Sequence, residues 1–189
     1  MVKLVLITKD ITKGLSNKKR KIMLNKHYIA IKDNSDEFWH LVYDYIDKRY
    51  NFDKIKNIYI SSDGGTWISS CTNVFPTAIT VLDKFHCNKA LTYIFGRSKV
   101  KRIALEYLKN DSIHDFKTLV GIQISLFPQK EKYINNHANY LINHINNIKN
   151  QDDKHYKVSC SMAGHVSHVL ANYMSSRPKD THINHRKLR

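Results

Sequence analysis

The sequence predicts an α/β protein in which helices flank a mixed sheet, and three observations lead to this class. Short apolar runs at 2–7, 27–31, 57–62 and 78–82 have the length and composition of strands. Longer segments between and after them repeat apolar residues at spacings of three and four, as helices do. Two of the strands end at a carboxylate, Asp63 and Asp83, which is where α/β proteins build ligand sites.

The first two strands, 2–7 and 27–31, are expected to form a hairpin around a polar turn at 13–21 that contains a basic Lys-Lys-Arg-Lys run. A helix should follow, because Asn34 and Ser35 offer an N-cap and acidic residues occupy the first turn. Its buried face is predicted to consist of Phe38, Trp39, Val42 and Ile46. Trp39 and Trp67 are interpreted as core residues.

The second half of the chain is predicted to be mainly helical. One helical region runs from Lys84 to about Asn110, and another from 113 to 149, which we interpret as a helical insertion at about 111–150. A last helix is expected at 162–174, followed by a basic tail at 179–189. No repeat or long linker interrupts the chain, so residues 1–178 are expected to form one domain.

Charge points to a polyanionic partner. Lys and Arg number 31 against 16 acidic residues, which gives a net charge of +15 and a pI near 9.7, the usual footprint of nucleic-acid binding. The predicted DNA-contacting residues form a basic helix face after Asp83 and one site after the last helix: Lys84, Lys89, Arg97, Lys99, Lys101, Arg102 and Arg177. No run approaches the ~20 apolar residues of a membrane span, so a cytoplasmic protein without membrane contact is expected.

Several residue groups could carry chemistry. Asp63 and Asp83 could bind Mg²⁺, which prefers oxygen ligands, although an Asp-Gly turn and a helix N-cap explain them equally well. Asp83, His86 and Cys87 form a conceivable transition-metal site. Cys160, His165 and His168 leave open a zinc-binding module, since the two histidines are one helical turn apart.

Three blocks of the chain resemble the bacterial ISLre-two-type insertion-sequence transposases. They are IYISSDGGTWI at 58–68, VLDKFHCNK at 81–89 and SCSMAGHVSHVLANYMSSRP at 159–178. The resemblance implies an RNase H-like catalytic domain of the DDE class, in which two aspartates and a glutamate bind Mg²⁺ or Mn²⁺ for DNA cleavage and strand transfer. It makes Asp63 the second catalytic aspartate and a metal ligand. Asp83 and His86 fall in a block with a positional or DNA-contacting role, and His165 and His168 fall in the last block.

Two departures from the family pattern shape the expected function. The family's first catalytic aspartate lies upstream of the segment that Met1 opens, and Ala163 stands at the glutamate position. The expectation is therefore a fragment truncated at the N-terminus, which lacks the first, central strand of the RNase H-like order 3-2-1-4-5 and is catalytically inactive. Its expected partners are transposon-end DNA and a full-length transposase. A non-enzymatic DNA-binding or regulatory protein is the alternative.

Overall fold

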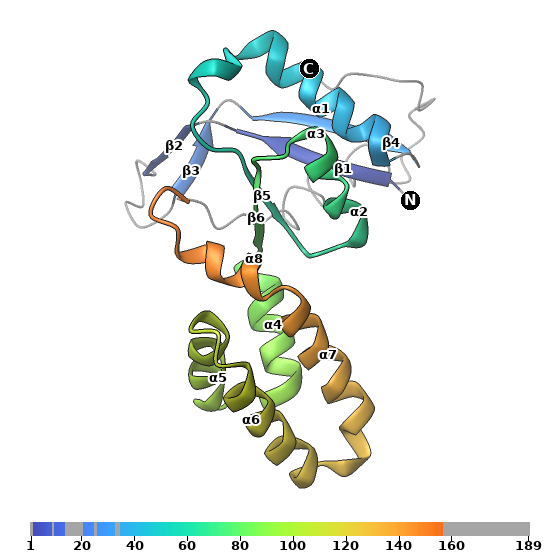
Figure 1. The fold of residues 1–189 in the computed structure, drawn as a ribbon, viewed down its shortest axis with the longest axis vertical. Coiled ribbons are helices and arrows are strands. Elements are labelled where there is room, and N and C mark those ends of the chain that lie inside the picture. Colours follow the sequence, from blue (N-terminus) through green and yellow to red (C-terminus); the bar gives the residue numbers. More distant parts are fainter. Residues whose placement is uncertain (1, 9, 14–20, 25, 33–34, 157–189) are drawn as a thin grey trace, which may run out of the picture. The chain divides into compact units, whose positions relative to one another are not determined.

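The chain folds into two compact units in a computed structural model, which describes residues 2–156 except 9, 14–20, 25 and 33–34 (Figure 1). Unit 1 contains Met1–Lys56 and Thr66–Thr77, and unit 2 contains Asn57–Gly65 and Ala78–Tyr156. Within the described part of the chain, helices are too short or too polar to span a bilayer. The last predicted helix and the basic tail lie outside the described residues.

Unit 1 begins with an antiparallel hairpin, as the sequence predicts. Strand β1 (Val2–Ile7) pairs with β4 (His27–Lys32), and Val2 lies opposite Lys32. Between them, β2 (Asp10–Lys13) pairs with β3 (Lys21–Leu24). The predicted turn at 13–21 is therefore too long, because Lys13 and Lys21 face each other as strand residues.

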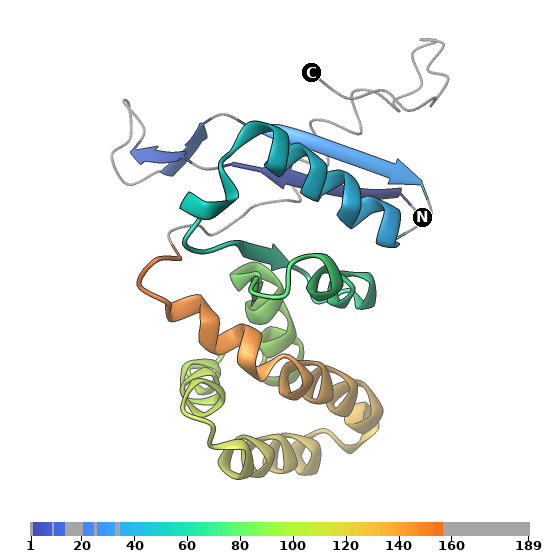
Figure 2. The same ribbon diagram turned by 45° about the horizontal axis from the view of Figure 1, so that its top comes forward.

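Helix α1 (Ser35–Arg49) follows and buries the four residues predicted for it: Phe38, Trp39, Val42 and Ile46. Figure 2 shows α1 lying along the β1–β4 hairpin. The Trp39 ring stacks on Trp67 at 5.8 Å, and its Nε1 donates to the Trp67 carbonyl oxygen at 3.2 Å. Trp39 is thus a core residue, as predicted, whereas Trp67 is half-buried and packs against that core. The remaining helical turns of unit 1 are η1 (Phe52–Lys54), α2 (Thr66–Ser69) and α3 (Cys71–Val74).

Unit 2 consists of two parallel strands and a group of helices. Strands β5 (Tyr59–Ser62) and β6 (Ile79–Leu82) pair side by side. The helices are α4 (Lys84–Phe95), α5 (Val100–Lys109), α6 (Ile113–Leu126), α7 (Glu131–Asn143) and α8 (Ile145–Lys149), with the short turns η2 (Pro128–Lys130) and η3 (Asn150–Asp152). These confirm that 113–149 is helical.

One helix boundary differs from the prediction. The expected helical region from Lys84 to Asn110 is split, because Gly96 has a φ of +63° and ends α4 there. The apolar periodicity continues on both sides of the break, so the pattern alone conceals it. Helix α5 starts in a new direction at Val100.

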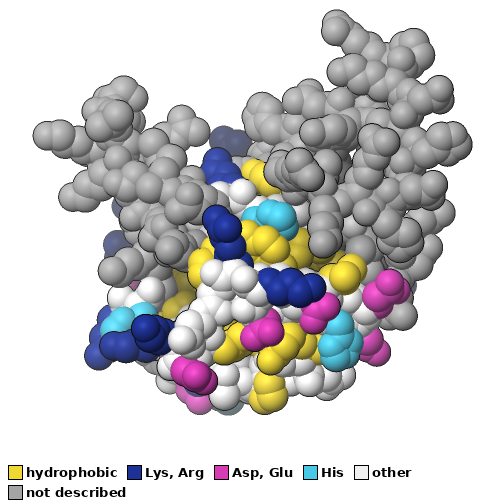
Figure 3. Space-filling view, turned by 90° about the horizontal axis from the view of Figure 1, so that it is seen from above, with side chains coloured by type: hydrophobic (Ala, Val, Ile, Leu, Met, Phe, Trp, Pro, Cys, Tyr) yellow, Lys and Arg dark blue, Asp and Glu magenta, His cyan; other side chains and the backbone are white. Residues whose placement is uncertain are grey.

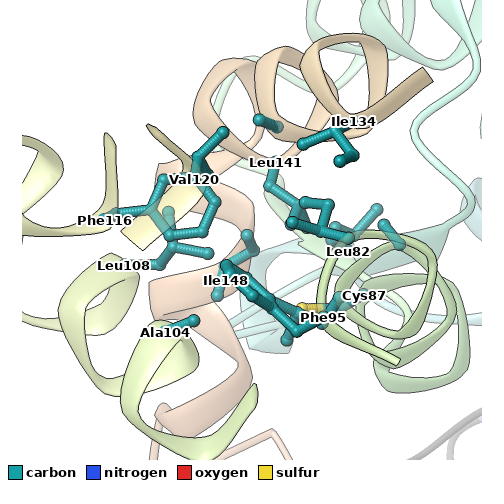
Figure 4. Close-up of a cluster of buried hydrophobic side chains, with 14 residues drawn as sticks. Leu82, Cys87, Phe95, Ala104, Leu108, Phe116, Val120, Ile134, Leu141 and Ile148 are labelled. Atoms are coloured by element: carbon teal, nitrogen blue, oxygen red, sulfur yellow. The ribbon is translucent and has the colours of Figure 1, made fainter. Parts of the chain in front are cut away.

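The core of unit 2 is built from the helices (Figure 4). Its completely buried side chains include Leu82 from β6, Leu91 from α4, Leu108 from α5, Phe116 from α6 and Leu141 from α7. The Phe116 ring meets that of Phe95 edge-on, with 6.4 Å between centroids. All five helices therefore contribute buried side chains to one core, which includes Leu82 at the end of β6.

Polar side chains close the outer edge of β6. Asn150 donates to the Thr80 carbonyl oxygen at 2.9 Å, and Gln151 donates to that of Leu82 at 2.7 Å. The Thr80 hydroxyl donates to the Asn147 amide oxygen at 2.9 Å. Two backbone carbonyl oxygens that a further strand would pair are thus occupied by side-chain amides, which protects this edge.

The strands described here form three two-stranded sheets. An RNase H-like fold with five strands in one sheet therefore remains a prediction.

Candidate functional site

The two predicted carboxylates follow neighbouring strands of unit 2. Because β5 and β6 are parallel and Ser62 lies opposite Leu82, Asp63 and Asp83 leave the same edge of the strand pair. Their surroundings differ sharply. Asp63 is exposed to solvent, whereas only 7% of Asp83 is exposed. Only Asp63 presents a freely accessible carboxylate at this edge.

Asp63 begins a tight turn. Its Oδ1 accepts a hydrogen bond from the Gly65 amide at 3.0 Å, and the Ser62 hydroxyl oxygen accepts one from Gly64 at 3.1 Å. Gly64 has a φ of +80°, which a residue with a Cβ rarely adopts. The Asp-Gly turn left open by the sequence is therefore formed, and it leaves the Asp63 carboxylate at the surface.

Two side chains at the C-terminal end of α7 hold this turn, Tyr140 within the helix and His144 at its C-cap. The Tyr140 hydroxyl donates to the Asp63 carbonyl oxygen at 2.6 Å. His144 lies with Nε2 3.1 Å from the Gly64 carbonyl oxygen and Nδ1 2.8 Å from that of Tyr140. A neutral imidazole can donate to one of these oxygens, and a protonated one to both. Helix α7 thereby fixes the backbone on which the Asp63 carboxylate is carried.

The Tyr140 hydroxyl is a permanent donor at neutral pH. Burial, together with the negative charge of nearby acids such as Asp63, raises the pKa of Tyr140 to about 12. Sequence reasoning did not assign a role to this residue. The available signal was the spacing of Tyr140 and His144, which puts them on one helix face, but nothing in the sequence identifies a partner 77 residues away.

Asp83 acts as the N-cap of α4, the second possibility left open by the sequence. Its Oδ1 accepts from the Phe85 amide at 2.6 Å. Burial raises the pKa of this carboxyl, while the Phe85 hydrogen bond and the His86 charge oppose the rise. Cys87 is also buried, which raises its thiol pKa to about 11. Without a metal, Cys87 is therefore a neutral thiol at neutral pH. Asp83, His86 and Cys87 are not among any group of three potential metal ligands that the described part of the chain brings together.

The capping geometry predicts opposite outcomes for two substitutions. Asp83→Ala removes the cap and should lower the free energy of unfolding by about 1 kcal/mol. Asp83→Asn keeps an acceptor without a buried charge, so it should match or exceed the wild type at neutral pH. Because the folded-state pKa is raised, the wild type loses stability relative to Asn as pH rises through that pKa. Thermal melts from acid to neutral pH measure this, and an Asn variant as unstable as Ala would contradict it.

The described residues do not fit the two-metal centre that the resemblance implies. Two divalent cations need several anionic oxygens, and at this edge Asp83 is buried with one oxygen engaged as a cap. No group of three potential ligands occurs among the residues whose positions the structure gives. Ala163, Cys160, His165 and His168 lie outside those residues. No metal-dependent step is therefore derived from this site.

The predicted basic face is rearranged by the break at Gly96. Lys99, Lys101 and Arg102 come together beside the turn between α4 and α5, where they line a pocket of about 250 Å³ with Asn88, Ser98 and Leu105. The Lys101 ammonium donates to the Thr92 hydroxyl at 3.1 Å, which orients it along α4. The prediction of one continuous basic helix face is wrong, because α4 and α5 are separate helices.

The other predicted DNA-contacting residues do not line this pocket. Lys84 and Arg97 are exposed, at the start of α4 and in the turn after it. The Lys89 ammonium lies 5.8 Å from the centre of the Tyr93 ring. Arg177 is outside the described residues. Six predicted contacts thus separate into a three-residue cluster and single sites.

Positive charge is uneven along the chain. Residues 1–32 contain nine Lys or Arg and one acidic residue, whereas α1 contains four acidic residues and two basic ones. On the face shown in Figure 3, acidic, basic, histidine and hydrophobic side chains are mixed among the described residues. Among the described cations, Lys99, Lys101 and Arg102 line a common pocket at the turn between α4 and α5.

Together these features describe a class of protein: an α/β protein that has an exposed carboxylate at the end of a parallel strand and a pocket lined by cationic side chains on the helices that follow. The chain belongs to UPF0236, an uncharacterised protein family whose profile matches residues 2–185. Two UPF0236 proteins of Caldanaerobacter subterraneus subsp. tengcongensis are 27% identical over 163 residues and 28% identical over 165 residues. Each match covers 84% of this chain and 35% of the relative, so the chain spans about a third of their length. No solved structure matches it significantly.

Proposed function

We propose that this chain is a DNA-binding part of an RNase H-like protein of the transposase class, and that alone it binds DNA without cutting it. The observation that carries the proposal is the pocket lined by Lys99, Lys101 and Arg102 on the helices that follow the Asp63–Asp83 edge. Lysine and arginine side chains that line one pocket offer charged donors to phosphates. The transposase class rests on the three motif blocks, which include both aspartates.

Two features of the strands support the fold part of the proposal. In the order 3-2-1-4-5 the fifth strand lies at an edge, and β6 has an outer edge closed by Asn147, Asn150 and Gln151. The hairpin of β1 and β4 followed by α1 and a parallel strand pair is the chain order of strands two to five. In this scheme Asp63 is the candidate ligand for Mg²⁺ or Mn²⁺ at the end of the fourth strand.

DNA binding should depend on salt and on the pocket. If the three cations contact phosphates, log affinity for duplex DNA falls linearly with log salt. Replacing Lys99, Lys101 and Arg102 together by Ala should reduce the slope by about one per lost contact. Fluorescence anisotropy at several salt concentrations measures this. Lys117→Ala, which removes an exposed lysine of α6, is the matched control and should leave the slope within experimental error.

The same samples test the absence of cleavage. Labelled duplex incubated with the protein and Mg²⁺ or Mn²⁺ should stay intact, because Asp63 is the one exposed carboxylate described at this edge. Cleavage that disappears in Asp63→Ala would overturn the non-cutting part of the proposal. An unchanged salt slope in the triple variant would overturn the role of the pocket.

A further inference from the structure

Helices α4 and α7 pack side by side (Figure 1), and aromatic and imidazole rings are spaced along their contact, starting at the Asp63 turn. We call this row the α4–α7 seam, and its members are Lys89, Tyr93, Tyr133, His137, Tyr140 and His144. Tyr133, His137 and Tyr140 are separated by four and three positions, so they occupy one face of α7, and His144 follows as its C-cap. At 1.5 Å per residue the helical part of this stripe is about 10 Å long.

The rings of the seam make contacts within two groups, one of three rings and one of two. The His137 ring lies 4.6 Å from both the Tyr93 and the Tyr133 centroids, and the two tyrosines are 5.6 Å apart. Tyr140 and His144 are 4.8 Å apart. Burial and the Lys89 charge lower the pKa of His137, so its imidazole is neutral at neutral pH. The middle of the seam is therefore a cluster of three uncharged rings.

This cluster is open to solvent. Tyr93 is 41% exposed and Tyr133 is 44% exposed, although aromatic rings of this size are usually placed where they contribute to a core. The Lys89 ammonium beside Tyr93 adds a positive charge at the edge of the rings. Exposed rings next to a cation match the faces and phosphates of unpaired nucleotides, since bases stack on aromatic side chains.

The opposite end of the seam is the candidate site itself. The Tyr140 hydroxyl donates to the carbonyl oxygen of Asp63, so the ring row starts at the residue that carries the exposed carboxylate. A strand seated on the seam would thus extend away from that carboxylate. The α4–α5 pocket is formed with Asn88 and Leu105 and contains no seam residue, so the two surfaces can be tested separately.

We propose that the α4–α7 seam binds the unpaired bases of a DNA strand, which stack on Tyr93 and Tyr133 while Lys89 contacts a phosphate. The inference rests on the proposed function, because it assumes that DNA is the partner. It adds a second contact surface, whose affinity for a strand depends on the presence of bases. The α4–α5 pocket, in contrast, responds to phosphates alone.

The test compares two probes with the full chain: a labelled oligothymidine strand and an abasic strand of the same length. Tyr93→Ala and Tyr133→Ala should each weaken oligothymidine binding by about fivefold or more and leave abasic-strand binding unchanged. Tyr93→Phe and Tyr133→Phe keep the rings and should retain wild-type affinity. Tyr43→Ala removes a comparably exposed tyrosine of unit 1 and is the matched control.

A spectroscopic readout separates stacking from a structural effect. With 2-aminopurine in the strand, binding should quench its fluorescence in the wild type and the Phe variants, and less in the Ala variants. Circular dichroism melts establish that each variant is folded. If the Ala variants lose equal affinity for both probes, or lose no affinity for oligothymidine, the proposed role of the seam is overturned. If the wild type binds neither strand and no duplex, the proposed function fails and the seam fails with it.

Discussion

Phe116→Ala is expected to lower the free energy of unfolding of unit 2 by about 3–5 kcal/mol. The side chain is 0% exposed and its ring lies edge-on against Phe95, so truncation leaves a cavity between α4, α5 and α6. Domains of this size are stable by only about 5–15 kcal/mol, so the loss is a large part of the total. Urea unfolding followed by far-ultraviolet circular dichroism measures it.

The structure decides which spectroscopic signal and which control variant suit the Phe116→Ala measurement. Both tryptophans, Trp39 and Trp67, belong to unit 1, so tryptophan fluorescence does not report on the unit that carries Phe116. Phe85→Ala makes the same chemical change at a ring that is 60% exposed, and it should cost less than about 1 kcal/mol. If both substitutions had equal effects, Phe116 would not belong to the core.

Gly64→Ala should lower the free energy of unfolding by roughly 2–4 kcal/mol and displace the Asp63 turn. A Cβ at this position would lie 2.5 Å from His144 Nε2, and the φ of +80° adds strain for any residue with a side chain. The imidazole cannot move aside while it keeps its contacts to the carbonyl oxygens of Gly64 and Tyr140. Thermal and urea unfolding of the full chain measure the cost.

A matched glycine makes this test specific. Gly121 lies inside α6 with no atom within 4 Å of an added Cβ, so Gly121→Ala should stabilise the protein by about 0.5–1 kcal/mol. The double variant Gly64→Ala/His144→Ala should recover the steric part of the loss and keep the backbone part. If Gly64→Ala and Gly121→Ala shift stability in the same direction, the contact between the turn and α7 is not as described.

Much of the local structure could be predicted because it depends on short-range patterns. The buried face of α1 follows from apolar spacing, and the ends of β5 and β6 follow from apolar runs that stop at Asp63 and Asp83. The split of the helical region at Gly96 could not be predicted in this way, since the apolar pattern continues through it. The pattern records which side chains are buried and does not record a change of helix direction.

The candidate site shows the same division between what a local pattern predicts and what it leaves open. Each aspartate was identified from its place after a strand, together with two alternative roles. The structure shows that Asp83 is a buried N-cap and that Asp63 is an exposed residue in an Asp-Gly turn. The choice depends on burial by helices that follow later in the chain, which a local pattern does not contain.

Local patterns were enough to predict most of the strands and helices, the excess of positive charge and a carboxylate at two strand ends. Packing alone brings Tyr140 and His144 to the Asp63 turn, three cationic side chains to one pocket, and the rings beside α4 and α7 to one seam. Each of these joins residues from different elements, up to 80 positions apart. Periodicity specifies the face of an element on which a side chain lies, whereas packing specifies what that face meets.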